Sequence, residues 1–284
     1  MKEHDFIKII EKETCSPYLG DDCAYLKDSN IVVTQDNFIE DVHFKRDWAT
    51  PYQIGYKAAA VNISDILASG AKPKYISVGL SLPNTTEEYF KKIYKGIKDG
   101  AFGAEIIGGD ITYAEKIMIS ITAIGTTKDR KISSRKNAKE GYVIISNSNF
   151  GISSEGLKQL KNGMKNTREI KTHLEPILDF NFSEEISTQI LDEYAMMDTS
   201  DGLADALFQI AKASHVKITT SFIPGMFGAE DYNLVAAVPQ TFLKKLSSYK
   251  IIGTVSKFDG FYLEIDNKSF SDYNELGLFN HFGD

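Results

Sequence analysis

The sequence contains few cysteines and histidines. Among its 284 residues there are two cysteines, Cys15 and Cys23, and five histidines that stand singly along the chain. Two cysteines cannot form the disulfide framework of a small secreted domain, and no Cys or His pair has the short spacing of a zinc site. The composition therefore argues against disulfide-dependent folding, thiolate chemistry and a zinc centre.

Long apolar segments and an excess of positive charge are also missing. The longest apolar stretches, such as residues 117–125, are strand-sized and fall short of the roughly 20 residues that cross a bilayer. The opening MKEHDFIKII has acidic residues where a secretory signal has a basic stub and an apolar run. The formal net charge of −7 disfavours electrostatic binding to nucleic acid or anionic lipid. We expect a cytoplasmic protein with no membrane or nucleic-acid partner.

Helical and extended patterns alternate along most of the chain. This alternation predicts an α/β or α+β fold, with mixed sheets flanked by helices. A polar and strongly basic segment, residues 128–141, separates two such halves. Segments of this kind often connect domains, so we expect an N-terminal domain of residues 1–137 and a C-terminal domain of residues 138–284.

The clearest predicted helix covers residues 51–69. Thr50 is a suitable N-cap, Pro51 suits the first turn, and Gly70 ends the pattern. Further helices are expected over residues 87–98, 154–162 and 183–194, and one starting near Asp201. Strands are expected over residues 31–36, 74–82, 104–109, 116–127, 142–147, 216–221, 232–238, 250–256 and 261–265.

Aspartates recur at the ends of these elements or inside an apolar helix. Asp65 is the most informative, because it shares a helix face with Asn62 and its other neighbours are apolar. A buried carboxylate needs a cation, hydrogen bonds or an edge position. Taken singly, each motif also has a purely structural interpretation, such as a strand-end turn. The segments are GDD (20–22), TQD (34–36), NISD (62–65), GGD (108–110) and DTSD (198–201).

Taken together, the aspartates with Thr34 and Ser200 form an all-oxygen set that suits Mg²⁺, which usually accompanies phosphate. The turn before the helix near Asp201 would offer free backbone N–H groups to an anion, although an N-cap alone would also explain it. P-loop, dinucleotide-binding and protein-kinase motifs are absent from the sequence. Arg130 and Arg135 would either neutralise polyphosphate or belong to a solvated linker.

Nine segments, in their order and spacing along the whole chain, resemble the thiamine-monophosphate kinase family of the aminoimidazole ribonucleotide synthetase-like superfamily. The resemblance implies a two-domain protein whose N-terminal domain forms a homodimer, with ATP and several Mg²⁺ ions between the domains. It also implies transfer of the ATP γ-phosphoryl group to thiamine phosphate, giving thiamine diphosphate and ADP. The segments are GDDCAYL (20–26), TQDNFIEDVHF (34–44), YKAAAVNISDILASGAKP (56–73), EIIGGD (105–110), SSRKNAKEG (133–141), MDTSDGL (197–203), GAEDYNL (228–234), IIGTV (251–255) and FNHF (279–282).

The resemblance further implies roles for individual residues. Gln35, Phe102 and Ala229 depart from the family pattern and are expected to change the substrate pocket more than the metal centre. The substrate contacts implied are His43, Glu230 and Phe279, and the nucleotide contacts are Phe102, Gly109, Asp110, Arg135 and Ser200. The Mg²⁺ ligands implied are Asp22, Thr34, Gln35, Asp36, Asp65, Asp110, Asp198 and Asp201.

The acceptor in such a reaction is itself an ionised phosphate, so we expect in-line transfer without a strong general base or a phosphoenzyme. Two alternatives stay open: a related ATP-dependent synthetase acting on another small molecule, and a non-catalytic nucleotide-binding protein. His43 and Phe279 also have a packing interpretation, against Phe44 and Leu278 respectively.

Overall fold

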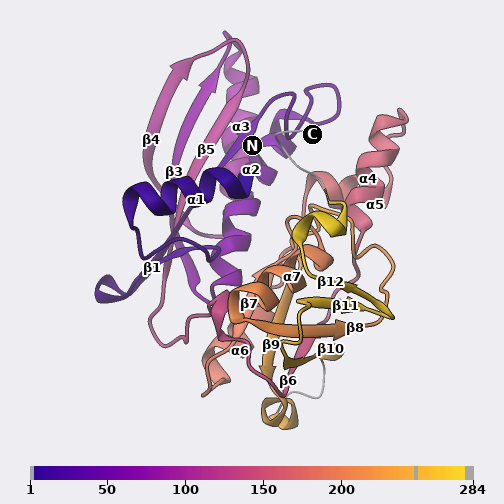
Figure 1. The fold of residues 1–284 in the computed structure, drawn as a ribbon. Helices are drawn as coiled ribbons and strands as arrows, with labels where there is room; N and C mark the ends of the chain where they lie inside the picture. Colours follow the sequence, from indigo (N-terminus) through magenta and orange to yellow (C-terminus); the bar gives the residue numbers. More distant parts are fainter. Residues whose placement is uncertain (1–2, 246–248, 279–284) are drawn as a thin grey trace.

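The computed structural model describes residues 3–245 and 249–278, which form two mixed sheets with helices packed around them (Figure 1). The first sheet has the strand order β1-β2-β5-β3-β4. β3 and β4 run parallel, and the other neighbours run antiparallel. The strands are β1 (Ala24–Leu26), β2 (Ile31–Ile39), β3 (Lys72–Leu82), β4 (Glu105–Tyr113) and β5 (Met118–Thr126).

The second sheet has the strand order β12-β11-β8-β10-β6-β9-β7. Its β8 and β11 run parallel, whereas the other neighbours are antiparallel. The mixed α/β fold predicted from the sequence is therefore confirmed. The strands are β6 (Tyr142–Ser146), β7 (Ala195–Asp198), β8 (Val216–Thr220), β9 (Leu234–Pro239), β10 (Lys250–Lys257), β11 (Leu263–Ile265) and β12 (Lys268–Phe270).

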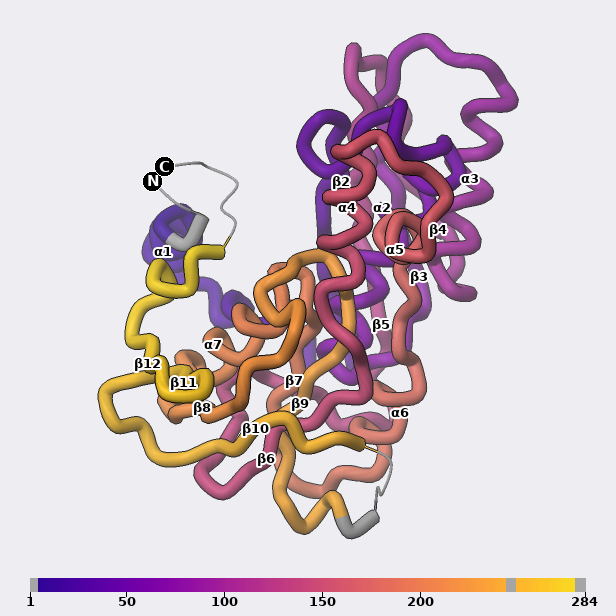
Figure 2. Tube along the Cα trace, turned by 90° about the vertical axis from the view of Figure 1, so that its right-hand side faces the viewer, coloured from indigo at the N-terminus to yellow at the C-terminus, as the bar shows by residue number. Residues whose placement is uncertain are grey.

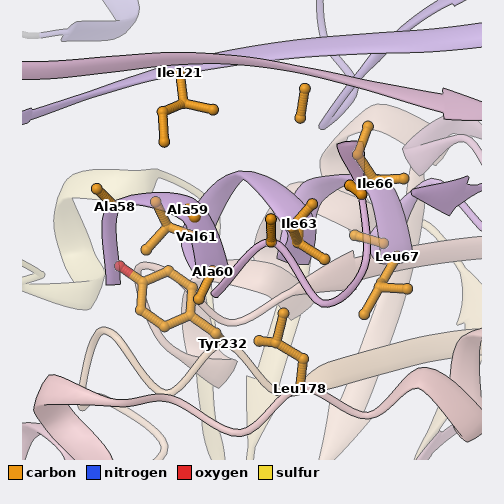
Figure 3. Packing of buried hydrophobic residues seen from close by; sticks show 14 of the residues in the cluster. Ala58, Ala59, Ala60, Val61, Ile63, Ile66, Leu67, Ile121, Leu178 and Tyr232 are labelled. Carbon is orange, nitrogen blue, oxygen red and sulfur yellow. The ribbon is translucent and has the colours of Figure 1, made fainter. Parts of the chain in front are cut away.

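Helix α2 (Pro51–Ala68) is the element on which both halves of the chain pack. Thr50 caps it as predicted, in a reciprocal capping box with Gln53. Most of its side chains are buried, and one continuous hydrophobic core surrounds it. Figure 3 shows Ile121 of β5 on one side of α2 and Tyr232 on the other. The alanine-rich sequence of α2 suits this position, because small side chains let several elements approach one helix.

The other helices lie around this core. α3 runs along α2, and α4 and α5 form a hairpin beside α2 (Figure 2). In the described part of the chain, no helix is both long enough and apolar enough to cross a membrane. The helices are α1 (Glu3–Thr14), α3 (Glu87–Gly100), α4 (Ile152–Lys161), α5 (Arg168–Leu174), α6 (Phe180–Gln189) and α7 (Leu203–Ser214).

Several element boundaries differ from the predicted ones. The helix predicted over residues 183–194 is α6, which ends five residues earlier because Ile190 has an extended backbone that leads into β7. The strand predicted over residues 104–109 continues to Tyr113, so Asp110 lies within β4 and not at its end. α1 and α5 were not predicted from the sequence.

The close packing of α2 and α3 depends on glycine. A Cβ at Gly96 would lie 1.9 Å from the Tyr52 carbonyl oxygen, and one at Gly100 would lie 2.2 Å from the Tyr56 carbonyl oxygen. Gly96→Ala should lower the free energy of unfolding by about 1–3 kcal/mol, because the helices must separate. Urea unfolding measures this, with the exposed Lys98→Ala as control. Equal stability of Gly96→Ala and the wild type would contradict the packing described here.

Candidate active site

Three aspartates from distant parts of the chain meet beside α2. Asp22 precedes β1, Asp65 lies near the end of α2, and Asp198 is the last residue of β7. Each offers a carboxylate oxygen, and these three oxygens all lie within 4.8 Å of one another. We term Asp22, Asp65 and Asp198 the acid cluster.

Hydroxyl groups orient two of these carboxylates. Thr34 Oγ1 of β2 donates to Asp65 Oδ2 at 2.7 Å, and Ser64 Oγ of α2 donates to Asp198 Oδ2 at 2.5 Å. The adjacent residues Ser64 and Asp65 therefore connect α2 to a strand of each sheet. This arrangement fixes the acid cluster at the junction of the two halves.

The acid cluster brings three carboxyl groups together where Asp198 is buried and Asp22 and Asp65 are partly buried. Burial, followed by the charges of Asp36, Asp198 and Asp22, raises the pKa of Asp65 well above its ordinary value. Burial and the neighbouring Asp22 raise the pKa of Asp198 to about 7. Carboxylates this close repel one another unless a cation or a proton intervenes. Carboxylate and hydroxyl oxygens are the donors that Mg²⁺ prefers, so these residues fit that ion.

Arg135 lies at the edge of the acid cluster. Its Nη2 donates to Asp22 Oδ1 at 2.8 Å, and its backbone N–H donates to Asp21 Oδ1 at 2.7 Å. The Ser134 hydroxyl also donates to the Asp21 carboxylate. A cavity of about 230 Å³ adjoins these groups and is lined in part by Asp21, Asp22, Tyr25 and Ser134. The cavity therefore borders Asp22 of the acid cluster.

The turn after β7 anchors the loop that carries Glu230. The Ser200 carbonyl accepts from the Glu230 N–H at 2.6 Å, and Thr199 Oγ1 accepts from the Asn233 N–H at 3.1 Å. The Asp231 carboxylate accepts from two backbone N–H groups at the start of α4. The turn, the loop and α4 are thus joined by hydrogen bonds into one unit.

The prediction of free N–H groups at a helix starting near Asp201 is partly wrong. The helix is α7, which starts at Leu203 after Gly202. The Ala204 N–H in its first turn donates to the Met226 carbonyl at 2.8 Å. That donor is therefore satisfied within the protein and is not available to an anion.

Glu230 lies beside a second pocket, toward the start of α2. Its Oε1 is 3.1 Å from Lys57 Nζ, and its Oε2 is 3.6 Å from His173 Nδ1. Burial opposes ionisation, but Lys57 and His173 together hold the pKa of Glu230 below its usual range. We term this the Glu230 pocket. Its lining residues include Phe38, His43, Phe44, Trp48, Lys57 and His173.

His43 is a packing residue whose stacking partner is Phe38, whereas the prediction named Phe44. Its ring stacks on Phe38 with 5.6 Å between centroids, and its Nδ1 accepts from the Ile39 N–H at 3.0 Å. The same ring lines the Glu230 pocket. Packing therefore fixes the orientation of the His43 ring in this pocket, and its contact with a substrate stays a prediction.

Two predicted residues make contacts outside the acid cluster. The Gln35 Oε1 accepts from Thr122 Oγ1 at 2.9 Å, on the neighbouring strand β5. The ring of Phe102 packs on Tyr56 and Phe180, with centroid distances of 5.8 and 5.1 Å. The Gln35 side chain thus binds within the first sheet, and the Phe102 ring belongs to an aromatic group beside α2.

The GGD segment lies in the edge strand β4. A Cβ at Gly109 would lie 1.8 Å from the Val78 carbonyl oxygen, so glycine allows β4 to approach β3. Asp110 is exposed in this strand and Asp201 is exposed in the turn before α7, so neither belongs to the acid cluster. Phe279 lies outside the described residues.

Three polar residues at these sites were not predicted from the sequence. Lys57 and Ser64 are only 2% and 1% exposed. A lysine inside the otherwise apolar stretch YKAAAV was the available signal for Lys57. His173 gave no comparable signal, because its importance depends on where α5 packs.

The chain is similar in sequence to known proteins. Residues 20–127 match the family described as AIR synthase related protein, N-terminal domain. The chain is 32% identical to the thiamine-monophosphate kinase of Bacillus subtilis in an alignment that covers 84% of each protein. It is 32% identical to that of Archaeoglobus fulgidus in an alignment that covers 99% of this chain and 98% of the relative.

The fold is also similar to solved structures. One is AaThiL complexed with AMPPCP and TMP, with a TM-score of 0.87 and 28% identity, covering 99% of this chain and 97% of that one. Another is the thiamine monophosphate kinase of Aquifex aeolicus, with a TM-score of 0.83 and 28% identity, covering 95% of this chain and 98% of that one.

Repulsion within the acid cluster predicts that Asp198→Asn stabilises the metal-free protein. The folded-state pKa of Asp198, about 7, lies above the unfolded value of about 3.9. The protonated carboxyl therefore favours folding below pH 4, and that contribution is lost as the pH rises through 7. In EDTA at pH 8, Asp198→Asn should raise the free energy of unfolding by about 1–3 kcal/mol.

Added Mg²⁺ should raise the melting temperature of the same variant by less than it raises that of the wild type. Thermal unfolding measures this difference directly. The exposed Asp192→Asn is the matched control and should behave as the wild type does. A wild type that is more stable than Asp198→Asn in EDTA at pH 8 would contradict the repulsion argument.

Proposed function

The chain belongs to the thiamine-monophosphate kinase family, and we propose that the acid cluster and the Glu230 pocket together form its phosphoryl-transfer site. The enzyme transfers the γ-phosphoryl group of ATP to thiamine phosphate, giving thiamine diphosphate and ADP. One observation carries the assignment of the site: both halves of it are built on α2. Ser64, which binds Asp198, and Lys57, which binds Glu230, are two helical turns apart and therefore about 10 Å apart on one side of the helix.

The acid cluster is the proposed Mg²⁺ site. Asp22, Asp65 and Asp198 would hold the metal, and Asp36 is close enough to influence Asp65. Bound Mg²⁺ would neutralise phosphate charge and orient the phosphate oxygens. The further ligands that the resemblance implies are Thr34, Gln35, Asp36, Asp110 and Asp201.

The nucleotide is proposed to bind at the cavity beside Asp22. The Arg135 guanidinium already lies against a carboxylate there, and a planar guanidinium is well suited to phosphate oxygens. Ser200 lies in the turn that anchors the Glu230 loop, which would connect the nucleotide side of the site to the acceptor side. Phe102, Gly109 and Asp110 are the other proposed nucleotide contacts.

Thiamine phosphate is proposed to place its rings at the Glu230 pocket, whose volume of about 10 Å³ must increase to admit them. A cationic thiazolium and an aminopyrimidine are stabilised by a carboxylate and by aromatic faces. Glu230 supplies the first, and Phe38, Phe44 and Trp48 supply the second. His43 and Phe279 complete the proposed contacts.

The proposed reaction is direct in-line transfer. The acceptor phosphate is largely ionised at neutral pH, so no side chain needs to act as a strong general base, and no phosphoenzyme is required. Thr34 and Ser64 hold two carboxylates in place, and Arg135 offsets part of the negative charge. Catalysis then consists of positioning two phosphates and neutralising their repulsion.

The proposed organisation has an ATP- and Mg²⁺-binding domain at residues 1–137 and a domain at residues 138–284 that completes the site. A homodimer through the first domain is supported by β4, an edge strand with Ile107, Ile111 and Tyr113 exposed by 55%, 56% and 71%. Exposed apolar edge strands tend to pair with other chains. The proposed location of the enzyme is the cytoplasm.

The function is tested by coupled ADP release from the purified protein with ATP and Mg²⁺. The acceptors compared are thiamine phosphate, free thiamine, aminoimidazole precursors and none, and mass spectrometry identifies the product. We expect thiamine diphosphate from thiamine phosphate alone. Absence of turnover with thiamine phosphate, alongside intact binding of Mg²⁺ and ATP, would instead indicate a synthetase acting on another small molecule.

The dimer is tested by introducing charge on β4. Ile107→Glu combined with Ile111→Glu should convert a dimer into a monomer in sedimentation equilibrium, because two carboxylates cannot be buried there unpaired. Leu191→Glu, at a residue that is 83% exposed, is the control and should leave the dimer intact. A wild type that is monomeric at micromolar concentration would refute the dimer.

A further inference from the structure

Lys57 is a buried cation in the middle of α2 that the acid cluster does not use. Its Nζ lies 3.1 Å from Glu230 Oε1, and beyond this ion pair Nζ has no hydrogen-bond partner among the described residues. A buried ammonium without an opposite charge is strongly unfavourable. Lys57 and Glu230 therefore depend on each other, although they come from opposite halves of the chain.

The backbone around Glu230 is fixed in an uncommon conformation. Glu230 and Tyr232 have φ angles of +65° and +53°, in the left-handed region that residues other than glycine seldom adopt. The loop is held there by the Ser200 carbonyl, which accepts from Glu230, and by the backbone N–H groups at the start of α4 that donate to Asp231. Strained backbone of this kind tends to persist where a side chain must be presented in one orientation.

His173 lies on the other side of the Glu230 carboxylate. It is 3% exposed, and its Nδ1 lies 2.9 Å from Ser153 Oγ and 3.6 Å from Glu230 Oε2. Burial, followed by the charge of Lys57, lowers the pKa of His173 to about 4. His173 is therefore neutral at pH 7, and Lys57 supplies the positive charge that Glu230 requires.

We propose that Lys57 is a positioning residue for the acceptor. It fixes the Glu230 carboxylate from the α2 side, and His173 supports the same carboxylate from α5. The carboxylate is thereby held in contact with the heterocyclic rings of thiamine phosphate. This inference rests on the proposed function of the Glu230 pocket. Under this proposal Lys57 has a role in binding the acceptor. It has none in binding ATP, because the proposed nucleotide site is at the other end.

The test compares Lys57→Met with the wild type in steady-state kinetics and in calorimetric titration with thiamine phosphate alone. Lys57→Met should raise both KM and Kd for thiamine phosphate by about tenfold or more, because removing one partner leaves a buried charge unpaired. KM for ATP should change by less than about twofold, since the nucleotide lies elsewhere. Lys57→Arg should recover part of the loss. Lys217→Met, which removes a lysine paired with Asp259 and Glu264 in the second sheet, is the control and should change neither constant.

A double-mutant cycle shows whether Lys57 acts through Glu230. If it does, Lys57→Met combined with Glu230→Gln should bind thiamine phosphate about as weakly as Glu230→Gln alone. Losses that multiply would overturn the proposal. Each single variant leaves one of the two charges without its partner, so thermal unfolding of all variants is measured first. Where a single variant does not fold, the double variant, which removes both charges, is compared with the wild type: thiamine phosphate bound as tightly as by the wild type would overturn the proposal.

His173 provides a spectroscopic readout of the charge that Lys57 places beside Glu230, and it is interpreted together with the Kd for thiamine phosphate. The charges acting on it are those of Lys57, Glu230 and Lys161. In Lys57→Met, the imidazole should titrate at a higher pH in an NMR titration, because a repelling cation is lost while Glu230 remains. An unchanged titration together with an unchanged Kd for thiamine phosphate would overturn the proposal. A wild type that does not phosphorylate thiamine phosphate would instead refute the function itself.

Discussion

The structure depends on keeping three carboxylates together against their mutual repulsion. Asp22, Asp65 and Asp198 come from a loop, a helix and a strand that are far apart in the sequence, and burial raises the pKa of the latter two. Such a cluster lowers stability until a cation enters, so the surrounding fold must compensate. The continuous core around α2 provides that compensation, because it buries apolar side chains from both halves of the chain at the same place.

Helix α2 also determines how the two ends of the site relate to each other. At one end Ser64 and Asp65 contribute to the acid cluster, and at the other Lys57 meets Glu230. A helix that is capped at Thr50 and packed on all sides changes its length and direction little. The separation between a metal-bound phosphate and the acceptor rings would therefore be set by a rigid element, and loops would adjust only the contacts around it.

The sequence was most informative where a local rule decided the structure. The helix starting after Thr50 and the unusual position of Asp65 followed from capping and from apolar neighbours, and the order of motifs indicated the family. Long-range geometry could not be predicted in this way. Strand register turns Gln35 toward Thr122, the extension of β4 carries Asp110 away from a strand end, and a left-handed loop brings Glu230 to Lys57. Each of these depends on contacts between segments distant in the sequence.

The central claim is that the acid cluster and the Glu230 pocket are two ends of one site built on α2. Its most direct test is a crystal structure of the protein with Mn²⁺ in place of Mg²⁺, a non-hydrolysable ATP analogue and thiamine phosphate, with anomalous data at the manganese edge. We predict an anomalous peak bound by Asp22, Asp65 and Asp198, and thiamine rings in contact with Glu230. Manganese bound away from these three carboxylates, or rings bound away from Glu230, would contradict the account.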